Sequence, residues 1–254
     1  SSLPAMKSAS QSFALAAVLW LSFASAGAQT TVSVNLDYAE GKYGERTKST
    51  SWTMPLIVKQ QIGDFGFKLN LPYIRATGTA ASGGDRFASS RQTQEGFGDL
   101  VATATWGLLD DEGAQFAVDL GAKAKLAVAD KRQDLLTTGR NDYSLLADVL
   151  RNFGNLTGFV TLGRTWKGDP AGINYRNPWF GTIGLSRKLQ PDLSLGAMVD
   201  YRQKLTPRGD PINEMTLFVE RKFSSQLKVQ GYLVRGFSDS SPDIGAGITV
   251  SARF

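Results

Sequence analysis

Apolar and polar residues alternate along most of the chain after Thr30, in stretches that recur at nearly even spacing. The closing stretch is the clearest: apolar side chains occupy every even position from Ile244 to Phe254, and small or polar ones occupy the odd positions. A period of two predicts a β-strand with one face for lipid and one for water, and about ten tilted residues cross a bilayer. An amphipathic edge strand of a soluble protein has the same local pattern, so the remaining stretches must distinguish the two.

The number of alternating stretches and the lengths of their connections indicate the architecture. The predicted strands centre on 32–38, 52–58, 65–73, 100–106, 116–126, 143–149, 156–166, 179–185, 193–201, 215–219, 227–233 and 244–254. Short connections alternate with mostly longer ones at 39–50, 75–96, 127–142, 167–177, 206–213 and 238–243. This layout predicts an all-β fold: a transmembrane up-and-down antiparallel β-barrel of 12 strands, with short periplasmic turns and longer extracellular loops. A soluble β-sandwich would have strands of about 5–6 residues and no reason to alternate its turn lengths.

Both ends of the chain fit export to the bacterial outer membrane. Met6-Lys7, the apolar run at 13–23 and the small residues Ala26-Gly27-Ala28 form a signal-peptide pattern, and the run is too short for a membrane-spanning helix. We therefore expect residues 1–28 to be upstream sequence plus signal peptide, and residues 29–254 to be the barrel. The terminal Phe254 resembles the signal that outer-membrane barrels present to the barrel insertion machinery, a predicted partner together with the outer-membrane lipids.

The composition excludes several kinds of chemistry. The chain has no histidine and no cysteine, so Ser-His-Asp triads, Cys-His dyads, His-containing zinc sites and the Ser-His pair of the outer-membrane phospholipase cannot form. No paired carboxylates stand out, and we expect no enzymatic activity, no cofactor and no metal. The net charge of +5 is modest, and no basic run with interleaved aromatic residues suggests nucleic acid as a partner.

If the apolar face meets lipid, the other face lines the interior and is charged. Its nine basic residues would be Lys59, Lys68, Lys123, Lys125, Arg202, Lys204, Lys222, Lys228 and Arg253. Its seven acidic residues would be Asp37, Asp99, Asp119, Asp148, Asp200, Glu214 and Glu220. The pore-lining candidates are Lys68, Asp119, Lys123, Lys125, Asp148, Asp200, Arg202, Glu220 and Lys228. Buried charges must pair or contact water, so the inventory predicts either a wet path or a salt-bridged filling.

Two functions are compatible with this interior. One is a porin-like channel for small-molecule solutes, with a weak preference for anions or aromatic acids; the other is a non-conducting barrel that binds a partner or stabilises the envelope. Lys123 and Lys125 are the strongest selectivity candidates, since only Asp119 is near them on the same face of their strand. We expect Leu120 and Val250 to face lipid, and Asp200 to face the interior.

Several short motifs resemble a family of putative outer-membrane transporters named after a phenol meta-cleavage pathway. They are Gly96-Phe97-Gly98-Asp99-Leu100 at a strand start, Leu71-Pro72-Tyr73 before the long loop, Gly236-Phe237-Ser238-Asp239, Asp243-Ile244-Gly245-Ala246-Gly247 and the aromatic terminus. The resemblance implies an outer-membrane barrel that passes hydrophobic or aromatic compounds, and it carries no catalytic residues.

Overall fold

The structure is a computed structural model that describes residues 29–78, 91–133 and 135–254. The expected signal peptide lies outside the described residues. The strands are β1 (Gln29–Gly41), β2 (Ser49–Ile62), β3 (Phe65–Gly78), β4 (Gln92–Phe97), β5 (Leu100–Asp111), β6 (Phe116–Leu126), β7 (Asp142–Phe153), β8 (Leu156–Trp166), β9 (Trp179–Gln190), β10 (Leu193–Arg202), β11 (Ile212–Lys222), β12 (Leu227–Gly236) and β13 (Ile244–Arg253). Within the described ranges, the structure has no helix of the length and apolarity needed to span a membrane.

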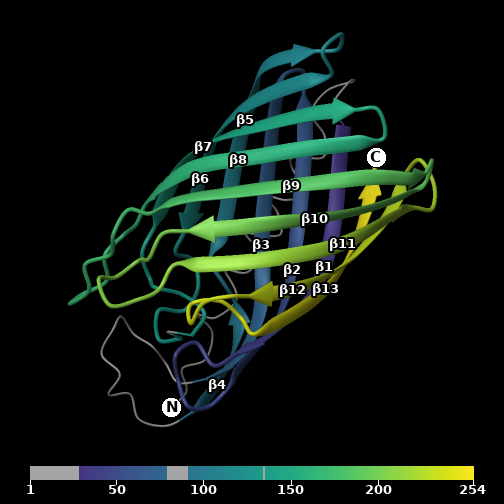
Figure 1. Ribbon diagram of the computed structural model, residues 1–254. Helices are drawn as coiled ribbons and strands as arrows, with labels where there is room; N and C mark the ends of the chain where they lie inside the picture. Colours follow the sequence, from purple (N-terminus) through teal and green to yellow (C-terminus); the bar gives the residue numbers. More distant parts are fainter. Residues whose placement is uncertain (1–28, 79–90, 134) are drawn as a thin grey trace, which may run out of the picture.

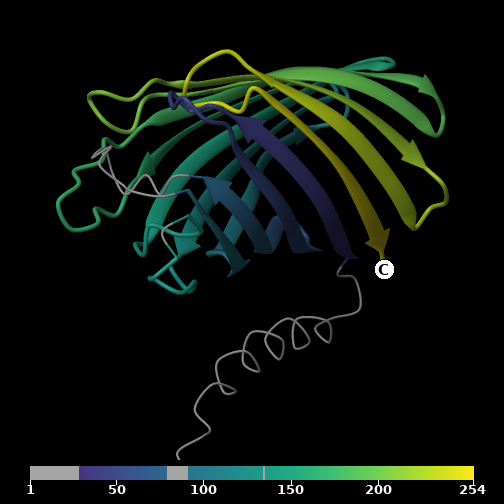
Figure 2. The same ribbon diagram turned by 90° about the horizontal axis from the view of Figure 1, so that it is seen from below.

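The strands form one antiparallel sheet that closes on itself (Figure 1). Consecutive strands pair with each other except β4 and β5, which both pair with β3; β1 also pairs with β13, and the β2–β3 pairing completes the ring. Figure 2 shows the strands curving around a common interior. Closure pairs both edges of every strand except the short β4, which pairs only with β3, and a lipid environment requires such pairing of the backbone. The predicted up-and-down barrel is confirmed.

The barrel has 12 strand positions although the sheet contains 13 strands, because β4 and β5 share one position. Both pair with β3, and Gly98 and Asp99 separate them. A Cβ at Gly98 would lie only 2.7 Å from Cδ1 of Ile74, so a larger residue at this break would require the Ile74 side chain to shift. The expected loop at 75–96 is therefore shorter than predicted, since β3 continues to Gly78 and β4 begins at Gln92; residues 79–90 lie outside the described residues.

The outer wall carries the apolar half of the alternating pattern. Val34 lies opposite Val250 across β1 and β13, and Leu120 lies opposite Ala147 across β6 and β7. Val34, Val250 and Leu120 are exposed, Val250 at 44% and Leu120 at 40%, as lipid contact requires. At the end with the short turns, the Phe254 N–H donates to the Thr30 carbonyl and the Arg253 N–H to the Gln226 carbonyl. The closing strand thus ends beside the 223–226 turn.

Large side chains on the inner wall lie against glycines of the neighbouring strands. A Cβ at Gly163 would collide with the Phe180 ring, and one at Gly184 would collide with the Phe159 ring. Phe218 against Gly196 and Tyr232 against Gly247 repeat the arrangement. Each ring fills the space that a missing Cβ leaves, and so lies along the wall instead of across the lumen.

Candidate functional site

A row of basic side chains crosses half of the inner wall. Lys59 on β2 lies directly opposite Lys68 on β3, and Thr103 on β5 separates Lys68 from Lys123 on β6. In the other direction, Thr31 on β1 connects Lys59 to Arg253 on β13. We call Arg253, Lys59, Lys68 and Lys123 the basic row. Non-adjacent segments of the chain thus bring four cations to one level of the sheet.

The three lysines of the basic row are not neutralised. None has a carboxylate within 4 Å in the part of the chain that the structure describes, and Lys123 Nζ lies 5.0 Å from the centroid of the Phe180 ring. Lys59 and Lys68 lie directly opposite each other on neighbouring strands. Two like charges in this arrangement destabilise the sheet. The Thr103 hydroxyl beside them is buried without a hydrogen-bond partner. These groups need water or a solute as their partner.

A row of acidic side chains crosses the other half of the inner wall. Directly opposed positions run from Glu214 (β11) through Asp200 (β10) and two threonines to Asp148 (β7) and Asp119 (β6). We call the four carboxylates the acidic row. The Thr161 hydroxyl donates to Asp148 and the Thr182 hydroxyl donates to Asp200. Hydroxyl donors therefore stabilise part of this row, whereas the lysines of the basic row have no comparable partners.

The two rows meet at a cavity of about 540 Å³ inside the barrel. Its basic side is lined by Lys59, Lys68 and Lys123, and its acidic side by Asp148. Phe180 and Leu146 add apolar surface from the inner wall. The cavity therefore combines cationic, hydrogen-bonding and apolar groups within a space that fits a small organic solute.

The extracellular mouth holds the densest polar network of the described residues. Lys125 Nζ lies 2.8 Å from Asp99 Oδ2 and 3.5 Å from Asp142 Oδ2, and Lys167 Nζ lies 2.5 Å from the same Asp142 oxygen. Asp99 is only 6% exposed and also accepts from the Thr137 hydroxyl. The prediction from sequence covered only acids on the strand of Lys125, whereas its two carboxylate partners, Asp99 and Asp142, come from other parts of the chain.

This network holds two extracellular loops at the mouth. In the loop after β6, the Thr137 hydroxyl donates to Asp99, and the Leu135 N–H donates to the Gln94 side chain on β4. In the 167–178 loop, the Tyr175 ring centroid lies 5.7 Å from Lys167 Nζ. Burial raises the pKa of the Tyr175 phenol, and the Asp142 carboxylate raises it further. Both loops are thus fastened to the inner wall at the mouth.

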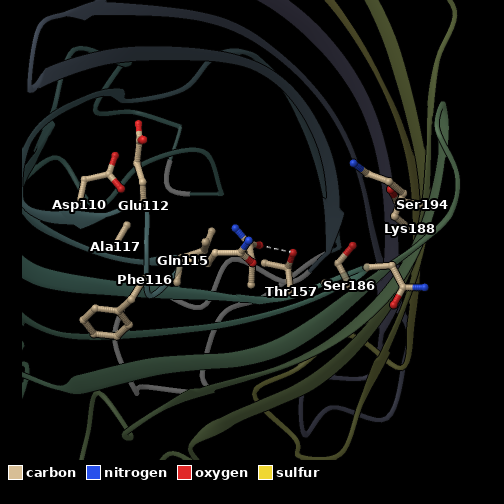
Figure 3. A pocket seen from close by; sticks show the side chains of 13 residues that line it. Asp110, Glu112, Gln115, Phe116, Ala117, Thr157, Ser186, Lys188 and Ser194 are labelled. Carbon is tan, nitrogen blue, oxygen red and sulfur yellow. Dashed lines mark hydrogen bonds between the residues drawn. The ribbon is translucent and has the colours of Figure 1, made fainter.

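The periplasmic end contains a second, more polar cavity of about 450 Å³ (Figure 3). Lys188, Ser186 and Ser194 line one side, and Asp110 and Glu112 line another. Between them, the Thr157 hydroxyl donates to Asn152 Oδ1 at 2.6 Å. The lumen is hydrophilic at this end as well.

The remaining candidates have different surroundings. Glu220 and Lys228 form an ion pair of 3.0 Å across β11 and β12, which neutralises both. Arg202 lies opposite Phe180 on β9, and its Nε is buried without a hydrogen-bond partner. The Phe254 side chain is 74% exposed at the periplasmic end. Its role as an assembly signal stays a prediction.

Sequence reasoning missed Asp142, Lys188 and the apolar inner residues. Asp142 was placed in a loop, but it has the same phase as Ser144 and Asp148, which could have identified it as inward-facing. Within the described ranges, no cluster of three or more His, Cys, Asp or Glu side chains is placed to hold a metal ion.

Comparisons with known proteins relate the chain to others by fold. No family model and no curated protein matches it. Among solved structures, the COG4313 outer membrane channel from Pseudomonas putida F1 aligns with a TM-score of 0.71 at 15% identity, over 91% of this chain and 97% of that one. The NanC porin aligns with a TM-score of 0.57 at 10% identity, over 87% and 98%. The KdgM porin aligns at 0.56 and 11% identity, over 88% and 99%.

These similarities concern architecture, and the closed sheet with its exposed apolar outer wall agrees with them. An apolar band around a closed barrel is stable only in a lipid bilayer, and barrels of this kind belong to outer membranes. The chain is therefore a transmembrane β-barrel of the outer-membrane type, with the architecture of the channel and porins above.

Proposed function

We propose that the barrel is a channel for small solutes with a weak preference for anions. The observation that carries the proposal is the basic row, whose lysines face the lumen without ion-pair partners in the described part of the chain. Cations that line a path raise the local concentration of anions and lower that of cations. The acidic row opposes this effect, so the preference is modest.

Aromatic or similar organic acids suit the central cavity best. Such a solute can place its carboxylate against Lys68 and Lys123 and its ring against Phe180 and Leu146. The unpartnered Thr103 hydroxyl supplies a donor at the same level. The KdgM porin, which shares the architecture, has been solved in complex with disordered oligogalacturonate, an acidic oligosaccharide. The resemblance to transporters of aromatic compounds agrees with an apolar portion in the solute.

Reversal potentials in planar bilayers test the proposal. We expect the wild-type protein to conduct and to favour anions weakly under a potassium chloride gradient. The double variant Lys68→Glu with Lys123→Glu should shift the reversal potential toward cations, because it reverses two charges at the cavity. Benzoate in place of chloride should carry current, and the variant should lose most of it.

A matched control changes the same number of charges on the lipid-facing wall. Arg151 and Arg187 lie opposite outward apolar residues near the periplasmic end. Replacing both with Glu should leave selectivity unchanged. Absence of conductance in the wild type would overturn the proposal in favour of the non-conducting barrel. Conductance that is indifferent to the Lys68 and Lys123 swap would overturn the role of the basic row.

A further inference from the structure

An arginine occupies a lipid-facing position on β8. Arg164 lies directly opposite Leu145 on β7, whose side chain is 58% exposed on the outer wall. On the other side it lies opposite Trp179 on β9. Its phase is that of Leu162 and Trp166, which also point outward. A cation among lipid-facing residues is costly unless an anion or the membrane interface stabilises it.

Two tryptophans hold this arginine in place. The Arg164 guanidinium carbon lies 5.8 Å from the centroid of the Trp166 ring and 5.6 Å from that of Trp179. Both distances are within the range of cation–π attraction. The tryptophans are 41% and 46% exposed, so the cluster lies at the surface of the barrel. The two rings confine the guanidinium, and they offer no hydrogen-bond acceptor atoms to its N–H groups.

Among the described residues, this cation has no hydrogen-bond or ion-pair acceptor. The Arg164 Nε is buried without a hydrogen-bond partner, and no carboxylate lies within 4 Å of the side chain in the described residues. Two other outward arginines at this end have an acceptor: Arg75 has Glu95 at 3.7 Å, and Arg235 donates to the Asp243 carbonyl at 2.8 Å. Arg164 has neither kind of partner among the described residues.

The position of Arg164 along the strand identifies the missing anion. β8 ends at Trp166 and enters the 167–178 loop, at the end of the barrel away from the short turns and the carboxyl terminus. Short turns are periplasmic in such barrels, so this end is extracellular. At that level the anions of the outer leaflet are the phosphates of its glycolipid, and guanidinium binds phosphate bidentately.

We propose that Arg164, held between Trp166 and Trp179, is a binding site for a phosphate group of the outer-leaflet glycolipid. The tryptophan rings and Leu145 contact the acyl and sugar portions beside the phosphate. The site lies outside the lumen, so it is independent of conduction. It ties one wall of the barrel to the lipid layer.

Binding of purified lipid A to the detergent-solubilised full barrel, measured by native mass spectrometry, tests this site. We expect one phosphorylated lipid A to bind wild type, and Arg164→Ala to bind it about tenfold more weakly, as the loss of a charge-assisted hydrogen bond predicts. Arg164→Lys keeps the charge and should recover part of the affinity. Enzymatically dephosphorylated lipid A should bind wild type as weakly as phosphorylated lipid A binds Arg164→Ala.

The control is Arg187→Ala, which removes the same charge from the lipid-facing wall at the periplasmic end. It should bind lipid A as wild type does, and heat-modifiability on gels verifies that each variant is folded. Equal lipid A binding by Arg164→Ala and wild type would overturn the site. Equally tight binding of dephosphorylated lipid A would overturn phosphate recognition, and inorganic phosphate that binds with the affinity of lipid A would overturn the assignment to a lipid.

Discussion

Removal of the Asp99 carboxylate should release the mouth network. Asp99 is 6% exposed and accepts from Lys125 at 2.8 Å and from the Thr137 hydroxyl at 2.7 and 2.8 Å. In Asp99→Ala, Lys125 keeps only Asp142 at 3.5 Å as an ion-pair partner within the described residues, and the Thr137 hydroxyl loses both contacts. Breaking a buried pair costs about 3–5 kcal/mol.

The expected cost here is smaller, because Lys125 is 23% exposed and retains Asp142. We expect Asp99→Ala to lower the free energy of unfolding by about 2–3 kcal/mol, measured by urea unfolding in lipid vesicles. Asp99→Asn keeps side-chain oxygen and nitrogen atoms that can hydrogen-bond to the Thr137 hydroxyl. It should therefore lower the free energy of unfolding by about half as much as Asp99→Ala. Hydrogen exchange should accelerate at the amides of Ala129 and Leu135, which lie in the loop that Asp99 holds.

A matched control is Asp210→Ala, an exposed carboxylate in the 203–211 connection. It should stay within about 0.5 kcal/mol of wild type, as surface substitutions do. The same urea midpoint for Asp99→Ala and Asp210→Ala, with unchanged exchange in the 127–141 loop, would refute the reasoning. The network would then be a consequence of the loop conformation and not its cause.

Three further outcomes are expected. Leu120→Lys places a charge on the lipid-facing wall and should cost about 2–4 kcal/mol at the bilayer midplane; equal stability to wild type in urea would mean that the strand phase is wrong by one residue. Deletion of Phe254 should lower the yield of heat-modifiable barrel in outer membranes, and recovery of wild type in the soluble periplasmic fraction would contradict the location. Gly184→Ala should push the Phe159 ring toward the lumen and reduce single-channel conductance, whereas adding Phe159→Ala should restore it.

The barrel itself could be predicted because membrane strands repeat one local rule. Each strand must alternate apolar and polar residues. The sequence therefore shows which residues face lipid wherever the outward positions are apolar and the inward ones small or polar, as on β6 and β13. The phase is weak on β8 and β9, where Arg164 and Gly181 occupy outward positions opposite Leu145 and Leu162. One of these irregular positions is the proposed glycolipid site.

The pairing of charges could not be predicted, because register across strands brings together residues far apart in the chain. Lys125 meets Asp99 and Asp142 only after β5, β6 and β7 are aligned. The predicted strand at 100–106 was also too short. The break at Gly98 and Asp99 conceals that β4, which precedes it, continues the pairing of β5 with β3. Composition gives the inventory of inward charges and does not say which of them are neutralised.

The contrast between two inward lysines on one strand shows why this distinction decides function. Lys125 is compensated by two carboxylates, so its charge stabilises the mouth loop and contributes little to the field in the lumen. Lys123 faces the cavity with no carboxylate within 4 Å in the described chain, on the same row as the opposed pair Lys59 and Lys68. Proteins retain unpaired, destabilising charges at positions where function requires them. Charge reversal at Lys125 should therefore change stability and loop exchange, whereas charge reversal at Lys123 should change selectivity.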